Sequence, residues 1–213
     1  MYEKERQELI DCALSMEAHG LIVQSGGNVS RRMPCGNILM TPSAMAYGSM
    51  DPEDLVLMDP DGKIIEGTRR PSSDHQALLY IFKHMPRVNV ILHTHQPYAV
   101  ALSLVADELP ACTTTLIDEL QGAVPVAPFT RSSDEGMGIS VVTHCNGSLA
   151  VILKHHGVMA YGKDPEQALS AAIYLEEGCK GYLAALATGR PVARLSAEQV
   201  AAESQERGYY GQP

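Results

Sequence analysis

Two histidines, His93 and His95, stand one residue apart in the apolar stretch VILHTHQPYAV, residues 90–100. Such a stretch is typical of a buried strand, in which side chains two residues apart leave the same face. Burying two imidazoles side by side costs free energy unless something satisfies their nitrogen atoms. A second apolar stretch, VILKHHGVMA, offers a third imidazole from either His155 or His156.

Three imidazoles together with a carboxylate suit a borderline divalent ion, and two strands can hold the imidazoles rigidly. The pattern therefore predicts one divalent metal ion per subunit, with Zn²⁺ as the first choice and Mn²⁺, Co²⁺ or Fe²⁺ as alternatives. The competing interpretation is ordinary core histidines satisfied by hydrogen bonds, which is what a lone histidine would indicate. His-x-His in one strand with a further histidine in another favours the metal.

Three short segments contain groups that could hold an oxyanion. Residues 25–32, SGGNVSRR, offer backbone and amide N–H groups, and residues 71–74, PSSD, place two hydroxyls where a helix is expected to begin. Residues 40–44, MTPSA, add Thr41 and Ser43. Each segment alone is more typical of a turn or a cap, but their occurrence beside the histidine pattern predicts an anionic substrate. Four arginines lie close to these segments in the sequence, namely Arg31, Arg32, Arg69 and Arg70.

The elements that must position these groups follow from the periodicity of apolar residues. Helical spacing predicts helices over residues 3–18, 74–85, 97–106, 138–145, 165–188 and 196–208. The expected N-caps are Ser72 or Ser73 for the helix from residue 74, Asp164 for the helix from residue 165, and Ser196, in an S-x-x-Q capping box, for the last helix. Strands are predicted over residues 37–41, 54–59, 63–67, 88–95 and 149–162, the last broken at Gly157. Residues 24–32 are interpreted as a glycine turn, and residues 111–117 are β-rich in composition. Strands and helices mix without regular βαβ alternation, which predicts an α/β domain with a central, mainly antiparallel sheet flanked by helices.

The composition limits the class of protein. The chain has 213 residues, of which 45% are hydrophobic, enough for one buried core. No apolar run approaches ~18 residues, and the charged N-terminus lacks the features of a signal peptide, so we expect no membrane span and no secretion. Five scattered cysteines without a C-x-x-C motif are typical of a reduced, cytoplasmic protein. The net charge of −9 argues against a nucleic-acid partner but allows a small anionic ligand.

In their order and spacing, the motifs GGNVSRR, TPSA, PSSD, HTH and HHGVMAYG resemble those of the class II aldolase/epimerase superfamily. The resemblance extends from about residue 4 to the C-terminus. It implies a single class II aldolase-like αβα domain over residues 1–213, assembled as a C4 homotetramer with active sites between neighbouring subunits. It also implies a divalent metal, commonly zinc, and a small phosphorylated sugar as substrate.

The same resemblance assigns residues to the site. The metal ligands fall on His93, His95 and His156, the histidine directly before glycine, and the acidic ligand falls on Asp74. Ala44 stands where the superfamily usually has glycine. The positions that bind the substrate phosphate fall on Gly27, Asn28, Ser43, Ala44, Ser72 and Ser73.

The superfamily includes L-fuculose-1-phosphate aldolase and L-ribulose-5-phosphate 4-epimerase, and the motifs match neither fully. Thr41 in place of a lysine, the short length and the VPVAPF stretch favour the aldolase. Asp74, Asp118 and the tail YYGQ, with Tyr210, favour the epimerase, although a C-terminal tyrosine also occurs in the aldolase. Thr114 stands where the aldolase carries a second tyrosine, and Leu116 stands where the epimerase carries a histidine before its catalytic aspartate.

We therefore expect a metal-dependent aldolase that cleaves a ketose 1-phosphate to dihydroxyacetone phosphate and an aldehyde, with L-ribulose-5-phosphate 4-epimerase as the alternative. The few polar partners in ACTTTLI, residues 111–117, favour a substrate such as 5-deoxy- or 5-methylthio-ribulose 1-phosphate. The expected catalytic residues are Asp74, Tyr210 and Asp118. Superfamily dehydratases would need a different acid–base group, and adducin-like binding modules have lost the ligands that this chain keeps.

Overall fold

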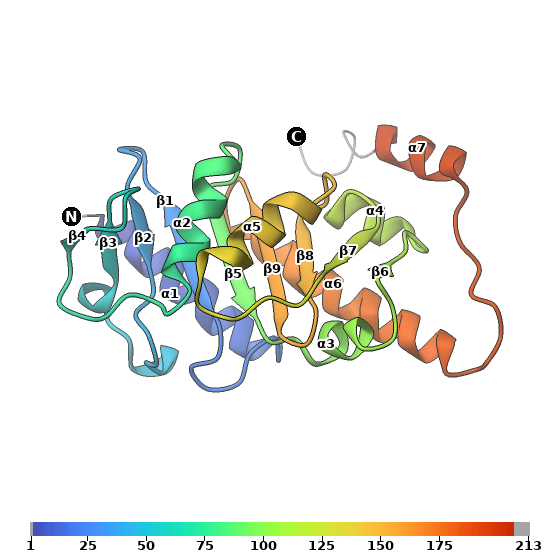
Figure 1. Cartoon of the computed structure of the whole chain (residues 1–213), viewed down its shortest axis with the longest axis horizontal. Helices are drawn as coiled ribbons and strands as arrows, with labels where there is room; N and C mark the ends of the chain where they lie inside the picture. Colours follow the sequence, from blue (N-terminus) through green and yellow to red (C-terminus); the bar gives the residue numbers. More distant parts are fainter. Residues whose placement is uncertain (1, 207–213) are drawn as a thin grey trace.

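The strands of this protein form one nine-stranded sheet in the order β4-β3-β2-β1-β5-β9-β8-β7-β6 (Figure 1). The computed structural model describes residues 2–206. Neighbouring strands pair antiparallel except for β7 and β8, which are parallel. The expectation of a mainly antiparallel sheet is therefore confirmed. The strands are β1 (Asn28–Arg32), β2 (Ile38–Met40), β3 (Val56–Met58), β4 (Ile64–Glu66), β5 (Val90–Thr94), β6 (Glu108–Leu109), β7 (Val124–Ala127), β8 (Ala150–Leu153) and β9 (Gly157–Gly162).

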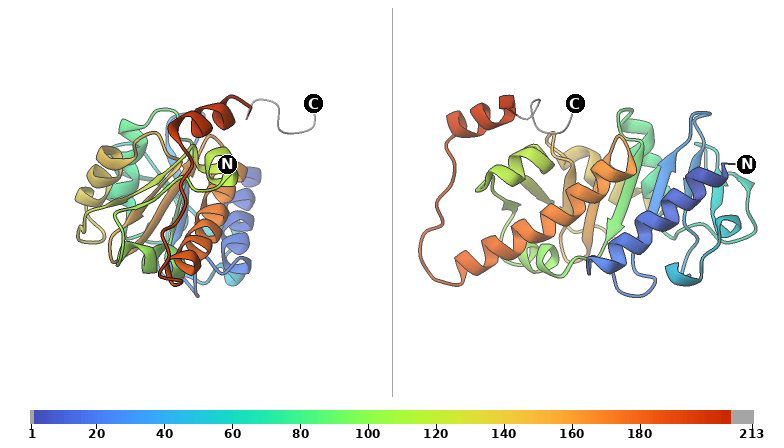
Figure 2. Two further views of the ribbon diagram at one scale, coloured as in Figure 1. Left: turned by 90° about the vertical axis from the view of Figure 1, so that its right-hand side faces the viewer. Right: turned by 180° about the vertical axis from the view of Figure 1, so that it is seen from behind.

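Helices cover both faces of the sheet, which makes three layers (Figure 2). One core cluster joins the sheet to α1, α3, α4 and α6, and a second joins it to α2 and α5. The helices are α1 (Glu3–Ala18), α2 (His75–His84), α3 (Pro97–Ser103), α4 (Thr114–Leu120), α5 (Glu135–His144), α6 (Pro165–Leu186) and α7 (Ala197–Glu206), with short 3-10 turns at Tyr47–Ser49 and Pro52–Asp54. None of the helices in the described part of the chain has the length and apolar character that crossing a membrane requires.

Strand β5 lies in the middle of the sheet between β1 and β9, and its side chains alternate between the two cores. Val90 and Leu92 belong to the core under α1 and α6, whereas Ile91 belongs to the core under α2 and α5. By this alternation His93 leaves the α2/α5 face and Thr94 the α6 face. The strand thus aims the first predicted ligand toward the helix that begins after Asp74.

Two local predictions were wrong. Residues 28–32, expected within a glycine turn, form β1 and pair with both β2 and β5. The β-rich stretch 111–117 enters helix α4 instead, because the hydroxyl of Thr113 accepts the N–H of Leu116 and the apolar side chains of that helix pack into the core. In both places tertiary packing overrides the local composition.

The helix caps were predicted with mixed success. Asp164 caps α6 by accepting the N–H of Gln167, as expected. At α2 the N-cap is Asp74 rather than a serine, and the hydroxyl of Ser72 accepts the N–H of Asp74 at 3.3 Å. The PSSD segment therefore forms a turn whose last residue is held at the start of α2.

Candidate metal centre and anion pocket

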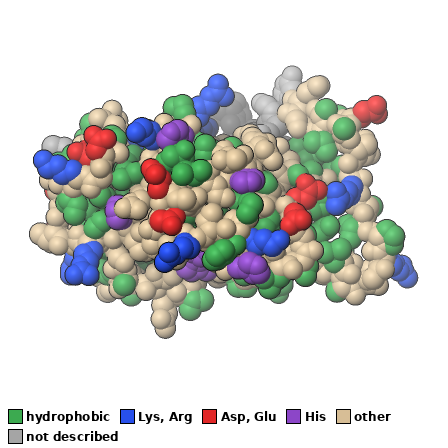
Figure 3. Space-filling model, in the orientation of Figure 1, with side chains coloured by type: hydrophobic (Ala, Val, Ile, Leu, Met, Phe, Trp, Pro, Cys, Tyr) green, Lys and Arg blue, Asp and Glu red, His purple; other side chains and the backbone are tan. Residues whose placement is uncertain are grey.

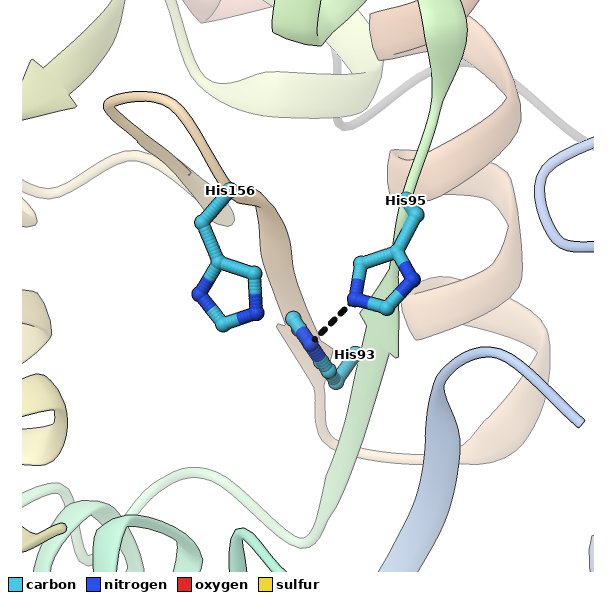
Figure 4. A group of neighbouring side chains, drawn as sticks. All are labelled: His93, His95 and His156. Carbon is cyan, nitrogen blue, oxygen red and sulfur yellow. Dashed lines mark hydrogen bonds between the residues drawn. The ribbon is translucent and has the colours of Figure 1, made fainter. Parts of the chain in front are cut away.

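Three imidazoles meet where β5 ends and β9 begins (Figure 4). Ligand nitrogen atoms of His93, His95 and His156 all lie within 4.8 Å of one another. His156 comes from the tight turn that joins β8 to β9, in which its N–H donates to Leu153 O at 3.0 Å. A Cβ at Gly157 would lie 2.2 Å from the carbonyl oxygen of Thr94, so glycine there lets the turn approach the end of β5 closely.

The turn also separates the two adjacent histidines that the apolar pattern alone could not distinguish. His155 adopts a left-handed backbone conformation, with φ of 62°. Its ring lies 6.4 Å from that of Phe129, outside the histidine cluster. His156 is the histidine that joins His93 and His95, in agreement with the residue implied by the superfamily pattern.

The hydrogen bonds of His93 suit a metal ligand. Nδ1 of His93 lies 2.9 Å from the carbonyl oxygen of Val158, which can only accept, so Nδ1 carries the proton of the neutral ring. Nε2 is then unprotonated, and it lies 3.1 Å from Nε2 of His95. A backbone carbonyl that fixes the tautomer in this way is the usual partner of a metal-binding imidazole.

The three imidazoles are held in the neutral form that binds metals. Burial, together with the neighbouring His156 and His95, lowers the pKa of His93 to about 4. The carboxylate of Asp74 acts in the opposite direction. Burial also lowers the pKa of His95 and of His156. His95 is exposed and His156 half-buried, so the cluster is open to solvent on their side.

A buried carboxylate lies beside the histidines. Oδ2 of Asp74 lies 3.8 Å from Nε2 of His93 and accepts a hydrogen bond from Nδ2 of Asn28 at 2.7 Å. Asn28 stands opposite His93 in the pairing of β1 with β5, which explains why the three groups meet. Three neutral imidazoles and one carboxylate, partly open to solvent, fit a borderline divalent ion with a free coordination position for substrate.

The histidine cluster opens into a polar cavity of about 310 Å³. The bridge between Pro42 and Pro71, together with the hydrogen bond from Ser43 N to Arg70 O, brings two of the predicted anion segments together. The cavity is lined by all six positions to which the superfamily pattern assigns the phosphate, namely Gly27, Asn28, Ser43, Ala44, Ser72 and Ser73. The structure thus places a surface of hydroxyl, amide and backbone N–H groups next to the histidines.

The backbone of this surface is tightly constrained. Gly27 has φ of 94°, and a Cβ there would lie 2.3 Å from the carbonyl oxygen of His93, so no larger residue fits. Ala44 has φ of 56°, in the left-handed region that favours glycine. This conformation explains why the superfamily usually has glycine where this chain has alanine.

The arginines near the anion segments do not line the cavity. Arg31 pairs with Glu8 at 2.5 Å, and Arg69 pairs with Asp54 at 2.8 Å. The guanidinium of Arg32 donates to backbone carbonyls, those of Phe82 and Val88 among them. In the described part of the chain, the groups available to a phosphate in this cavity are therefore hydroxyls, an amide and backbone N–H groups.

The two other predicted catalytic residues are not brought into this cavity. Asp118 lies half-buried on α4 and is not one of the residues that line it. Tyr210 lies outside the described residues. Of the three predicted catalytic residues, the described structure therefore places Asp74 alone beside the histidines.

Two cavity residues escaped the sequence analysis. Ser132 and Ser133, in the loop between β7 and α5, line the cavity on the side of α5. The only signal was two adjacent hydroxyls just before the expected start of a helix, which is also typical of an ordinary cap.

The outer face of α2 and α5 carries acidic and basic side chains interspersed, without a broad basic patch (Figure 3).

Comparison with known proteins agrees with this geometry. Residues 7–183 match the family described as Class II Aldolase and Adducin N-terminal domain. The chain is 32% identical over 194 residues to an L-fuculose phosphate aldolase of Haemophilus influenzae, covering 91% of this chain and 89% of that protein. It is 30% identical over 193 residues to an L-ribulose-5-phosphate 4-epimerase of Salmonella paratyphi C, covering 84% and 83%.

A third relative and a solved structure extend the comparison. The chain is 30% identical over 192 residues to a 5-deoxy-D-ribulose 1-phosphate aldolase of Bacillus thuringiensis, covering 90% of each protein. It superimposes on a solved L-fuculose 1-phosphate aldolase with a TM-score of 0.91 at 25% identity, covering 97% of each chain. The relatives thus act on phosphorylated sugars, by cleavage in some and by epimerisation in another.

Proposed function

The chain belongs to the class II aldolase and adducin family, and from that premise we propose that it is a metal-dependent aldolase that cleaves a ketose 1-phosphate to dihydroxyacetone phosphate and an aldehyde. The observation that carries the proposal is the convergence of His93, His95, His156 and Asp74 beside a cavity lined with hydroxyl and backbone N–H groups. A site that only bound proteins would need neither the imidazoles nor the anion-binding surface.

These four residues would hold one divalent ion, Zn²⁺ as the first choice. When bound, the ion supplies Lewis-acid polarisation of the substrate oxygen atoms, the chemistry that stabilises negative charge in a retro-aldol cleavage. Nδ1 of His93, donating to Val158 O, keeps the ring oriented with Nε2 toward the cluster. Asn28 holds the carboxylate of Asp74 in place.

Substrate binding is divided along the cavity in this proposal. The phosphate lies against Asn28, Ser43, Ser72 and Ser73, together with the backbone at Gly27 and Ala44. The ketose carbonyl and its neighbouring hydroxyl then face the histidines. Binding the phosphate there fixes one end of the sugar, and that end lies close to the bond that breaks.

Proton transfer needs groups at two places. In the cleavage direction, a base removes the proton of the C4 hydroxyl, and the carbon of the enediolate afterwards gains a proton. Asp74 is one of the four residues proposed to hold the ion and is also the candidate base, because a substrate that took its place on the ion would free its carboxylate. Phenols carry their proton at neutral pH, so Tyr210 suits the aldehyde oxygen, which gains a proton in the condensation direction. We place Tyr210 over the cavity of a neighbouring subunit in a C4 homotetramer.

For the substrate we propose 5-deoxy-ribulose 1-phosphate or its 5-methylthio analogue. The relative named 5-deoxy-D-ribulose 1-phosphate aldolase supports this choice. All five cysteines are free, as expected in a reducing compartment, and we propose that the enzyme acts in the cytoplasm.

L-Ribulose-5-phosphate 4-epimerase is the second candidate, because Asp118 and the YYGQ tail match the epimerase pattern and an epimerase is 30% identical. Against the epimerase, Thr41 stands where that enzyme has a lysine. The buried hydroxyl of Thr41 accepts the N–H of Val29 at 3.2 Å. The two functions are separated by incubating the metal-loaded protein with ketose 1-phosphates and ketose 5-phosphates. Release of dihydroxyacetone phosphate identifies the aldolase, and interconversion of 5-phosphates without it identifies the epimerase.

A further inference from the structure

The backbone of His95 is not held by the sheet. Strand β5 ends at Thr94, whose pairing with Val158 is the last in the register of β5 with β9. His95 and Gln96 follow, and α3 begins at Pro97. The position of His95 therefore depends on what holds residues 96–99.

Two buried side chains form hydrogen bonds that hold this turn against α6. The carboxylate of Glu176 accepts the N–H of Tyr98 at 2.9 Å with one oxygen and the N–H of Ala99 at 3.0 Å with the other. Nε2 of Gln96 donates to the carbonyl oxygen of Ala172, one turn earlier on α6, at 2.8 Å. Gln96 is completely buried and Glu176 is 8% exposed.

These contacts account for the first turn of α3. Pro97 has no N–H, those of Tyr98 and Ala99 go to Glu176, and that of Val100 goes to the carbonyl oxygen of Gln96. A glutamine at position 176 would offer an acceptor to only one of the two N–H groups, and an alanine to neither. The carboxylate of glutamate thus accepts both N–H groups of the turn, whereas the amide of glutamine accepts one.

Alternation along the chain assigns separate tasks to adjacent residues. His93 leaves β5 on the face of α2 and α5, where the candidate metal centre lies, whereas Gln96 reaches α6 on the opposite face. Consecutive residues therefore present metal ligands on one side of the sheet and an anchor on the other. Glu176 lies across the sheet from the cavity and does not line it.

A buried carboxylate with no part in the chemistry requires a structural reason. Burial raises the pKa of Glu176, and the hydrogen bonds from Tyr98 and Ala99 act in the opposite direction. Leaving a charged group in the core costs free energy unless its partners are fixed. Here the fixed partners are the backbone groups that immediately follow a candidate metal ligand.

We infer that Glu176, assisted by Gln96, is a positioning residue of the metal centre, which fixes the turn after His95 so that its imidazole meets those of His93 and His156. The inference rests on the proposed metal centre and deepens it. It predicts that a change on the far face of the sheet alters the affinity and geometry of a bound divalent ion.

The test uses full-length metal-free protein titrated with Co²⁺, with the ligand-field absorption of the bound ion as the readout. Glu176→Ala should bind Co²⁺ about 10- to 100-fold more weakly than wild type, with a changed absorption spectrum, as is usual when the support of a ligand is removed. Glu176→Gln keeps one acceptor and should lie between Glu176→Ala and wild type.

Two control variants separate positioning from general stability. Glu177→Ala removes the exposed carboxylate of the neighbouring residue, and Glu177 pairs with Lys180 at 3.8 Å. This variant should bind Co²⁺ as wild type does. Ser148→Ala removes a buried hydrogen bond to Leu120 O at the opposite end of β8 from the histidine turn, so it lowers stability without touching the centre.

The outcomes are distinct. Wild-type affinity and spectrum in both Glu176 variants, with a loss of melting temperature like that of Ser148→Ala, would overturn the inference. If Glu176→Ala does not fold, the nearly isosteric Glu176→Gln decides, because weakened Co²⁺ binding supports the inference and wild-type binding overturns it. Wild-type protein that binds no Co²⁺ would overturn the metal centre itself, and this inference with it.

Discussion

The histidine end of the cavity and helix α4 carry different shares of the proposed chemistry. His93, His95 and His156 come from two segments of the sheet and meet with Asp74 in one cavity. Asp118, in contrast, lies on α4 and does not line that cavity. In the described part of the chain, the groups proposed to bind metal and phosphate lie together, whereas Asp118, the candidate for a second acid–base group, lies apart from them. Binding and proton transfer should therefore be separable by mutation.

The largest effect is expected at the histidine end. Replacing His93, His95 or His156 by alanine removes one of four ligands, so the bound metal should be lost and activity should fall by roughly 10³-fold or more. His95 and His156 are not fully buried, so their variants should keep the fold. Metal analysis and circular dichroism of the purified variants check both statements. Stoichiometric metal in the triple alanine variant would disprove the assignment.

The phosphate side should respond without loss of metal. Ser73→Asp puts a carboxylate where the phosphate is proposed to bind, and repulsion between the two anions should weaken substrate binding by more than about 10²-fold. Ser73→Ala loses one hydrogen bond to a charged group and should cost about 10-fold. Binding of the phosphorylated ketose by calorimetry, with metal content measured in parallel, gives both numbers. Normal affinity in the aspartate variant would mean that the phosphate binds elsewhere.

The histidine side and the phosphate side of the cavity differ in how far the sequence alone could describe them. His93 and His95 were singled out from their period-2 spacing in an apolar stretch, because a fully buried central strand makes a strong local signal. Asn28 was expected in a turn, since two arginines and two glycines hide the pattern of a strand that is recognised only from its pairing with β5.

Other features depend on contacts between distant segments and leave little local trace. The choice of His156 rather than His155 depends on the turn before β9, and the helix of α4 depends on the core beneath it. Ser132 reaches the cavity because of where α5 packs, and the anchor at Glu176 depends on the turn after His95. Conversely, the caps at Asp164 and at Ser196, which accepts the N–H of Gln199, are local and were predicted.

The next prediction concerns proton transfer. Tyr210→Phe should lower kcat by roughly 10²-fold, the usual worth of a positioned acid–base group, with little change in metal content or substrate affinity. Asp118→Asn should cost less than this in an aldolase and about as much in an epimerase. Steady-state kinetics of both variants provide the comparison. Unchanged turnover of Tyr210→Phe would discard the role of the tail.

The smallest effect, a partial recovery, tests whether the cavity and Tyr210 of the C-terminal tail meet across a subunit boundary. A Tyr210→Phe protomer keeps an intact cavity, and a His95→Ala protomer keeps an intact tail, so each variant alone should be nearly inactive. In mixed C4 tetramers, random assembly pairs an intact cavity with an intact neighbouring tail at about a quarter of the interfaces. Activity after co-expression should therefore rise to about a quarter of the wild-type value. If Tyr210 instead acted within its own subunit, every protomer would lack one of the two groups, and mixing would restore nothing.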